Sequence, residues 1–191
     1  MKKIISLACT ALAVLLLLSS CAAQDKSTAK RINAASDFEF CLLENVEEHD
    51  FGGCGALYGF GVTKYYGKDY ELAKDDNGYI IEEGEYVSYE VTAWPDESNG
   101  GKFVTAIYCT DMDVRVLGLT LENSLDEFSA ALSDMGFKVK ESEQYGTDGI
   151  IKEYTAIKAE KGGISVYICD YGQSKTLSIR ADVSNKLGII Y

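Results

Sequence analysis

The chain has 191 residues, 47% of them hydrophobic, and its 18 basic and 30 acidic residues give a net charge of −12 at pH 7. This excess of acid repels phosphate backbones and therefore excludes nucleic acid as a partner. The hydrophobic content is sufficient for a core, and the length is that of one domain or of two small halves that share a sheet.

The first 20 residues have the pattern of a cleaved signal peptide. Lys2 and Lys3 precede an uncharged, almost wholly apolar run over residues 4–18. This run is too short for a transmembrane helix, which needs about 20 residues. It matches the hydrophobic region of a signal peptide, and a membrane-spanning anchor is the alternative interpretation.

Residues 18–21, Leu-Ser-Ser-Cys, resemble the lipobox of bacterial lipoproteins, in which an aliphatic residue and two small residues precede a cysteine. The resemblance implies that residues 1–20 are removed and that the Cys21 thiol carries a diacylglyceryl group. Two or more acyl chains anchor a protein stably to a bilayer. The expected location is therefore extracytoplasmic, on a cell membrane or an outer membrane.

The mature chain would be more acidic than the precursor. Cleavage of the signal peptide removes two lysines and no acidic residue, which leaves 16 basic and 30 acidic residues and a net charge of −14. The lipid, rather than a basic patch, would then hold the protein at the membrane. Residues 22–36 are small and polar with no apolar period, and they predict that residues 21–36 are a lipidated cysteine followed by a flexible tether. Residues 37–191 are expected to form a single α+β domain.

Most of that domain alternates apolar and polar residues with the period of β-strands. Strands are expected at residues 38–43, 56–66, 70–74, 79–83, 86–94, 102–110, 137–142, 150–158, 164–169 and 176–183. Asn77-Gly78 is a strong signal for a tight hairpin turn. The hairpins at residues 91–107 and 154–168 echo each other, which favours two related half-sheets.

One segment predicts a helix. Ser124 and Glu127 form a Ser-x-x-Glu capping box, and Gly136 provides the stop. One face of the helix is apolar, with Leu125, Phe128, Leu132 and Met135 at helical spacing. The expected fold class is therefore α+β, an antiparallel sheet with one amphipathic helix packed on one face.

Residues 118–137 are similar to an element of the β-lactamase-inhibitor-like units and of the small outer-membrane assembly lipoprotein. In this element a strand ends in glycine, and a polar turn, a Ser/Thr cap, an amphipathic helix and a second glycine follow. The resemblance implies a helix packed on an antiparallel sheet. It also implies protein–protein binding without catalysis.

Four cysteines remain once Cys9 is cleaved away and Cys21 is acylated: Cys41, Cys54, Cys109 and Cys169. Cys54 lies in a glycine-rich loop, which favours a disulfide bridge with Cys41. Buried free thiols are the alternative, and the apolar surroundings of Cys109 and Cys169 favour burial. Neither a C-x-x-C motif nor a second histidine is present, so zinc is not expected.

Residues with catalytic or metal-binding chemistry are few. His49, the only histidine, lies among acids and is interpreted as part of a polar loop, with a general base or metal ligand as the alternative. Asp111 and Asp113, and likewise residues 75–77, are either turn residues or Ca²⁺ ligands. The G-x-S-x-G and H-E-x-x-H motifs are absent. No catalytic residue, cofactor or metal site is therefore predicted.

The most unusual content of the chain is its 13 tyrosines. Tyrosine is enriched at interfaces because its ring buries much area while its hydroxyl stays hydrogen-bonded. Tyr65, Tyr66 and Trp94 adjoin turns, so they are expected to be exposed and to bind a partner, whereas Tyr89 lies in mid-strand. The leading prediction is a non-catalytic module that binds a protein or envelope partner. The alternatives are a carbohydrate-binding or hydrolytic lipoprotein and a structural envelope protein.

Overall fold

The computed structural model describes residues 24–50, 55–58, 62–68, 70, 73–81, 84–93, 101–144 and 154–182. The predicted signal peptide, Cys21, Cys54 and Trp94 lie outside the described residues. None of the helices among the described residues is both long and apolar enough to cross a bilayer.

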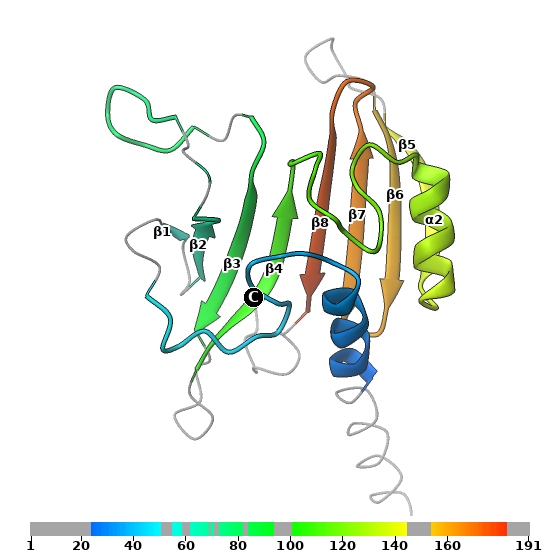
Figure 1. The fold of residues 1–191 in the computed structure, drawn as a ribbon, viewed down its shortest axis with the longest axis horizontal. Helices are drawn as coiled ribbons and strands as arrows, with labels where there is room; N and C mark the ends of the chain where they lie inside the picture. Colours follow the sequence, from blue (N-terminus) through cyan, green and yellow to red (C-terminus); the bar gives the residue numbers. More distant parts are fainter. Residues whose placement is uncertain are drawn as a thin grey trace, which may run out of the picture.

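The described strands form one antiparallel sheet in the order β1-β2-β3-β4-β8-β7-β6-β5 (Figure 1). The strands are β1 (Gly55–Tyr58), β2 (Val62–Tyr66), β3 (Val87–Ala93), β4 (Lys102–Cys109), β5 (Lys138–Gln144), β6 (Tyr154–Lys161), β7 (Ile164–Asp170) and β8 (Lys175–Ala181). Two four-stranded meanders therefore meet where β4 pairs with β8. The α+β class and the antiparallel sheet are confirmed.

Four strand predictions are wrong in detail. The single strand expected at 56–66 is the hairpin of β1 and β2. The described residues of the strands expected at 70–74 and 79–83 form only an isolated bridge between Lys74 and Ile80, around a turn in which Gly78 has a φ of 84°. Residues 38–43 form no strand, although Phe40 and Leu42 are buried.

The predicted helix is present as α2 (Leu125–Asp134). The Ser124 side chain accepts a hydrogen bond from the Glu127 backbone, and the Glu127 carboxylate accepts one from the Ser124 backbone, which completes the capping box. Phe128 and Leu132 are fully buried, and Gly136 ends the helix with a φ of 82°. This segment therefore folds as its local sequence dictates.

The flexible tether predicted for residues 21–36 is contradicted over most of its length. Residues 24–34 form a helix that precedes α2 in the chain, so the prediction of a single helix is also wrong. Ala29 and Ile32 are buried in the core, and the Arg31 guanidinium donates to the carbonyl oxygens of Asp134 and Met135 at the end of α2. The packed fold therefore begins before residue 37.

The start of the residue 24–34 helix is fixed to the turn between β6 and β7. The backbone N–H of Gly163 donates to the buried Asp25 carboxylate at 2.9 Å. A Cβ atom at Gly163 would lie 3.0 Å from the other oxygen of that carboxylate. Any larger residue at this position would push the Asp25 carboxylate aside, so glycine favours the close approach of the helix to the turn.

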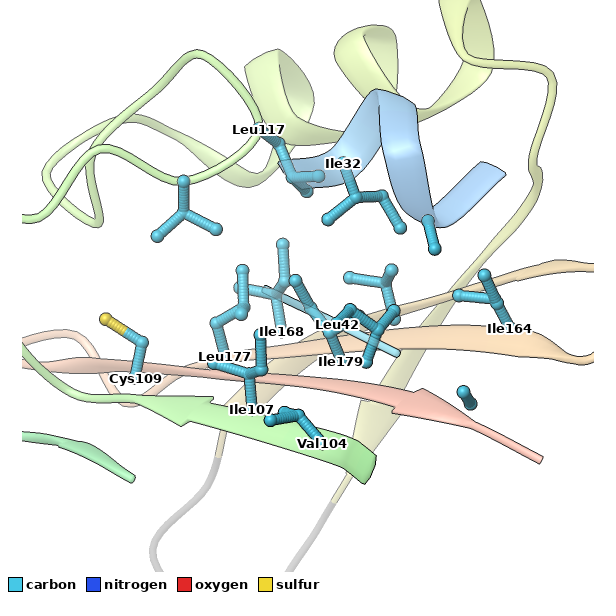
Figure 2. Packing of buried hydrophobic residues seen from close by; sticks show 14 of the residues in the cluster. Ile32, Leu42, Val104, Ile107, Cys109, Leu117, Ile164, Ile168, Leu177 and Ile179 are labelled. Carbon is cyan, nitrogen blue, oxygen red and sulfur yellow. The ribbon is translucent and has the colours of Figure 1, made fainter. Parts of the chain in front are cut away.

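The two helices lie on the same side of the sheet and cover one of its faces (Figures 1 and 2). Figure 2 shows Ile32 and Leu117 reaching down towards Ile107, Ile168 and Ile179 of the strands. These residues belong to one cluster of buried side chains. We call the opposite side of the sheet the open face, because no helix among the described residues lies on it.

Candidate binding surface

The sequence-predicted binding residues do not form one surface. Tyr65 and Tyr66 are neighbours in β2 and therefore point to opposite sides of the sheet. Tyr65 packs against the core on the helix-covered face. Tyr66 is only 7% exposed and lies edge-on to the Tyr86 ring. The expected exposure of Tyr66 is therefore wrong, whereas mid-strand Tyr89 is buried as expected.

The other polar residues considered from the sequence have structural roles. His49 packs edge-on against Phe40, with ring centroids 4.6 Å apart. One oxygen of Asp75 accepts from the backbone N–H groups of Asn77 and Tyr79. Asp111 accepts from the Asp113 backbone and from the Tyr70 hydroxyl. These carboxylates act as turn residues. No group of three metal-ligating side chains comes together within the described ranges.

Cys41 is a free, exposed thiol, and Cys54, its predicted bridge partner, lies outside the described residues. Cys109 and Cys169 are buried free thiols on different faces of the sheet. The Cys109 thiol donates to the Asp111 carbonyl oxygen at 3.4 Å, and burial raises its pKa to about 12.

A hollow with a volume of about 540 Å³ lies between the residue 24–34 helix and residues 41–43. Its described lining consists of Lys26, Ala29, Lys30, Asn33, Ala34, Cys41, Leu42 and Leu43. None of these side chains is a carboxylate, so the lining does not provide the acid–base pair that a hydrolytic site needs.

The open face carries a row of tyrosines that crosses the sheet. Residues directly opposite each other on neighbouring strands point to the same side. The register places Tyr66, Ser88, Tyr108, Ser178, Tyr167, Lys158 and Lys140 in one row from β2 to β5. Tyrosine and serine alternate over the first five positions, so each ring has a small neighbour and room to lie against the sheet.

A second row runs beside the first and carries most of the charge. It contains Lys64, Glu90, Ala106, Arg180, Ser165, Glu160 and Lys138. The Lys158 ammonium forms an ion pair with Glu160 at 2.7 Å. This contact and the charge of Lys140 lower the pKa of Glu160. Lys64, Tyr66 and Ser88 at the β2–β3 end are buried, so the accessible aromatic, hydroxyl and charged groups of the two rows lie from β4 to β5.

Tyr108 lies at the centre of this surface between two cations. The Lys64 ammonium is 5.2 Å and the Arg180 guanidinium 5.1 Å from the centre of its ring, both within cation–π range. The Tyr108 hydroxyl and the Arg180 guanidinium both donate to the same oxygen of Glu90, at 2.9 and 3.1 Å. The ring and the guanidinium are therefore held in fixed positions, while 53% of the Arg180 side chain stays exposed.

A second group of tyrosines lies in the other half of the sheet. The rings of Tyr154 and Tyr171 are 5.1 Å apart, and a hydrogen bond joins Tyr154 to Tyr167. Burial, followed by this hydrogen bond, raises the pKa of Tyr167. Both halves of the open face therefore present aromatic side chains with hydrogen-bonded hydroxyls.

The sequence contains only part of the signal for this surface. The period-two alternation identifies which residues of one strand share a face, and Lys64 with Tyr66 is one example. The pairing of β4 with β8 joins Tyr108 to Ser178, seventy positions further along the chain. Period-two alternation carries no information about such distant pairing, so the row as a whole was not predicted.

Comparison of the chain with family models, with curated proteins and with solved structures finds no significant match in any of the three. The function is therefore inferred from the chemistry of the chain's own residues.

Proposed function

We propose that this chain is an exported lipoprotein, held on the outer side of a cell membrane or an outer membrane by acyl chains on Cys21. It acts as a non-catalytic module whose open face binds a protein or envelope partner. The lipobox at residues 18–21 supports the anchor. The polar and aromatic open face supports the binding role.

One observation carries the binding role: Tyr108 and Arg180 are fixed in place before any partner arrives. Tyrosine and arginine are the side chains that most often dominate the energy of protein interfaces. Immobilising such side chains on binding normally opposes association. Glu90 and Lys64 already hold this pair, so less conformational entropy remains to be lost.

The positions of the open-face carboxylates favour binding over glycoside hydrolysis. Hydrolysis by paired carboxylates needs two of them within about 10 Å of each other. Glu90 and Glu160 belong to β3 and β6, which are four strand spacings apart, or roughly 19 Å. Glu90 is moreover bonded to Tyr108 and Arg180. A carbohydrate-binding or purely structural role remains the alternative that the experiment below addresses.

We also infer that the two halves of the sheet are related units. Each half begins with a helix and continues with a four-stranded meander. Thr28 and Ile32 are buried four positions apart in the first helix, as Phe128 and Leu132 are in α2. The equivalent hairpins are then β3–β4 and β7–β8, not the pair at residues 91–107 and 154–168 that the sequence echo indicated.

Site-specific photo-crosslinking in intact cells tests the proposed face. A photoreactive side chain replaces Ser178 at the centre of the open face, and the matched control replaces Ala130 on the exposed side of α2. We expect covalent adducts from position 178 only, and we expect Arg180→Ala to weaken them. Adducts from position 130 alone would show that the partner binds the helical side. Adducts with glycan instead of protein would support the carbohydrate alternative.

A further inference from the structure

The open face is basic in a strongly acidic protein. Its described strands carry five basic side chains and two acidic ones, a net charge of +3, or +2 without the buried Lys64, whereas the whole chain has −12. The basic residues are Lys64, Lys138, Lys140, Lys158 and Arg180. Charge is therefore segregated: acid dominates the rest of the molecule, and base dominates this face.

Two of these lysines break a rule of sheet stability. Lys140 and Lys158 lie directly opposite each other on β5 and β6 and point to the same side. Like charges in this relation destabilise a sheet. Glu160 forms an ion pair with Lys158, lies directly opposite Lys138 and is also influenced by the charge of Lys140, but within the described part of the chain neither Lys138 nor Lys140 comes within ion-pair distance of a carboxylate. Such unfavourable pairs are typical of sites that select for a ligand rather than for stability.

We propose that the open face binds an acidic segment of a partner protein, with Lys138, Lys140, Lys158 and Arg180 as the groups that contact its carboxylates. Tyr108 and Tyr167 provide the contact area between them. This inference rests on the proposed binding function and adds the chemistry of the partner to it.

The spacing of the cations defines the segment. Arg180 on β8 and Lys138 on β5 lie in the same row, three strand spacings or roughly 14 Å apart. An extended peptide rises about 3.3 Å per residue. A peptide that crosses the strands would therefore place carboxylates about four residues apart over these two positions, with the side chains between them against Tyr167.

The charge distribution favours a short acidic segment over a membrane or a long polyanion. Charges interact in physiological salt over a Debye length of about 8 Å. An anionic bilayer or a polyphosphate extends beyond the basic face and meets the acidic remainder of the molecule. An acidic stretch of a few residues gains the attraction and avoids that repulsion. Tyrosine and arginine, moreover, are the side chains typical of protein interfaces.

Binding of fluorescein-labelled decaglutamate to the full mature chain carrying Cys21→Ser tests this inference. We expect binding that weakens as NaCl is raised, because the contacts are ionic. Lys140→Gln with Lys158→Gln should weaken it about tenfold. The matched control, Lys26→Gln with Lys30→Gln, removes the same charge from the helix-covered side and should leave binding nearly unchanged. Lys140→Gln alone should raise the melting temperature by relieving the opposed charges.

Three outcomes would overturn the inference. One is the absence of decaglutamate binding, and another is equal binding by the double lysine variant and its control. The third is tighter binding to polyphosphate or to phosphatidylglycerol vesicles than to decaglutamate at equal charge. If adducts at position 178 persist in the double lysine variant, the open face still binds a partner and only its acidic character is disproved. If position 178 gives no adducts even when all the lysines are unchanged, the proposed function itself is disproved.

Discussion

Cys109 and Cys169 illustrate how the sheet decides the chemistry of single residues. Cys109 lies on the helix-covered face beside Leu177, and Cys169 lies on the open face beside Ala156. The sheet separates the two sulfur atoms, so these cysteines cannot bridge. The thiolate is the reactive form, and burial raises the pKa of Cys109 to about 12.

Burial and the charge of Glu44 also raise the pKa of Cys41, but its exposure leads us to expect that it reacts with a thiol reagent faster than the other two described cysteines in the folded protein. Cys41 is exposed, whereas Cys109 and Cys169 should react only after unfolding. Mass spectrometry of labelled peptides, with and without denaturant, measures each site. If Cys41 is unreactive at first and becomes reactive after reduction, it forms a bridge to Cys54, and this result would contradict the prediction that Cys41 is a free thiol.

Ser124 is expected to affect the stability of the fold, because its side chain forms half of the capping box. Ser124→Ala removes the acceptor for the Glu127 backbone N–H and should destabilise the fold by about 1 kcal/mol in denaturant melts. Ser133→Ala, at an exposed position of the same helix, is the matched control and should have little effect. Equal effects at both positions would mean that the cap contributes nothing beyond helix propensity.

The contribution of the capping box to stability is expected to depend on pH. Hydrogen bonds from Ser124 and Asn123 lower the pKa of Glu127 in the folded state. A carboxylate with a lowered pKa stabilises the fold above its unfolded pKa, and this contribution is lost as the pH falls through the folded value. The difference between the wild type and Glu127→Gln in melts should therefore vanish at low pH.

At the scale of elements, the two helices show what local pattern reveals and what it hides. The α2 segment was predicted with its cap and its buried face, because every signal lies within a dozen residues. The residue 24–34 helix was missed because few of its buried side chains are apolar. Asp25 and Thr28 are buried through hydrogen bonds, and the Gly163 backbone that binds Asp25 lies far along the chain.

Residues 38–43 were mispredicted for a related reason. Their alternation favours a strand, but the Asn33 side chain takes the place of a neighbouring strand. Its amide donates to the Leu42 carbonyl oxygen and accepts from the Leu42 backbone N–H. Leu43 then turns the chain with a φ of 64°. An amide supplied by a missed helix cannot be anticipated from the alternation itself.

Asp25→Ala tests whether the first helix is part of the domain. The substitution leaves the Gly163 N–H without its acceptor at a part-buried site, so we expect a loss of about 1–3 kcal/mol. Ser27→Ala, at an exposed position of the same helix, is the control. Unchanged denaturant melts for Asp25→Ala would restore the interpretation of this segment as a tether.

Phe128→Ala tests the packing of α2. The ring is fully buried against the sheet, so its removal should cost about 3–5 kcal/mol. Leu125→Ala, at a half-buried position of the same helix, should cost less. Similar losses in denaturant melts would contradict the burial that places Phe128 at the centre of the interface.

At the scale of the whole molecule, the pairing of β4 with β8 is the feature that local sequence patterns do not reveal. The pairing joins Ala106 to Arg180 and brings the two meanders into one sheet. The α+β class and most strand positions follow from periodicity. Strand order and the composition of the open face do not, because both depend on this distant pairing.

The anchor is the prediction that belongs to the whole molecule. Cys21→Ser removes the thiol that would be acylated, and the protein should move from the membrane fraction to the soluble fraction. Fractionation followed by N-terminal sequencing measures both location and cleavage. Membrane retention with residues 1–20 still attached would contradict the lipobox interpretation and favour a signal anchor.

The position of the first helix limits how far the domain can move from such an anchor. The described part of this helix starts at residue 24, three positions after Cys21, and three extended residues span at most about 10 Å. With Cys21 acylated, the domain stays beside the headgroups and searches for its partner in two dimensions. Confinement of two proteins to the same thin layer raises their effective concentration, as a short linker does. Individually weak contacts on the open face are then sufficient, provided that the partner is itself held at that membrane.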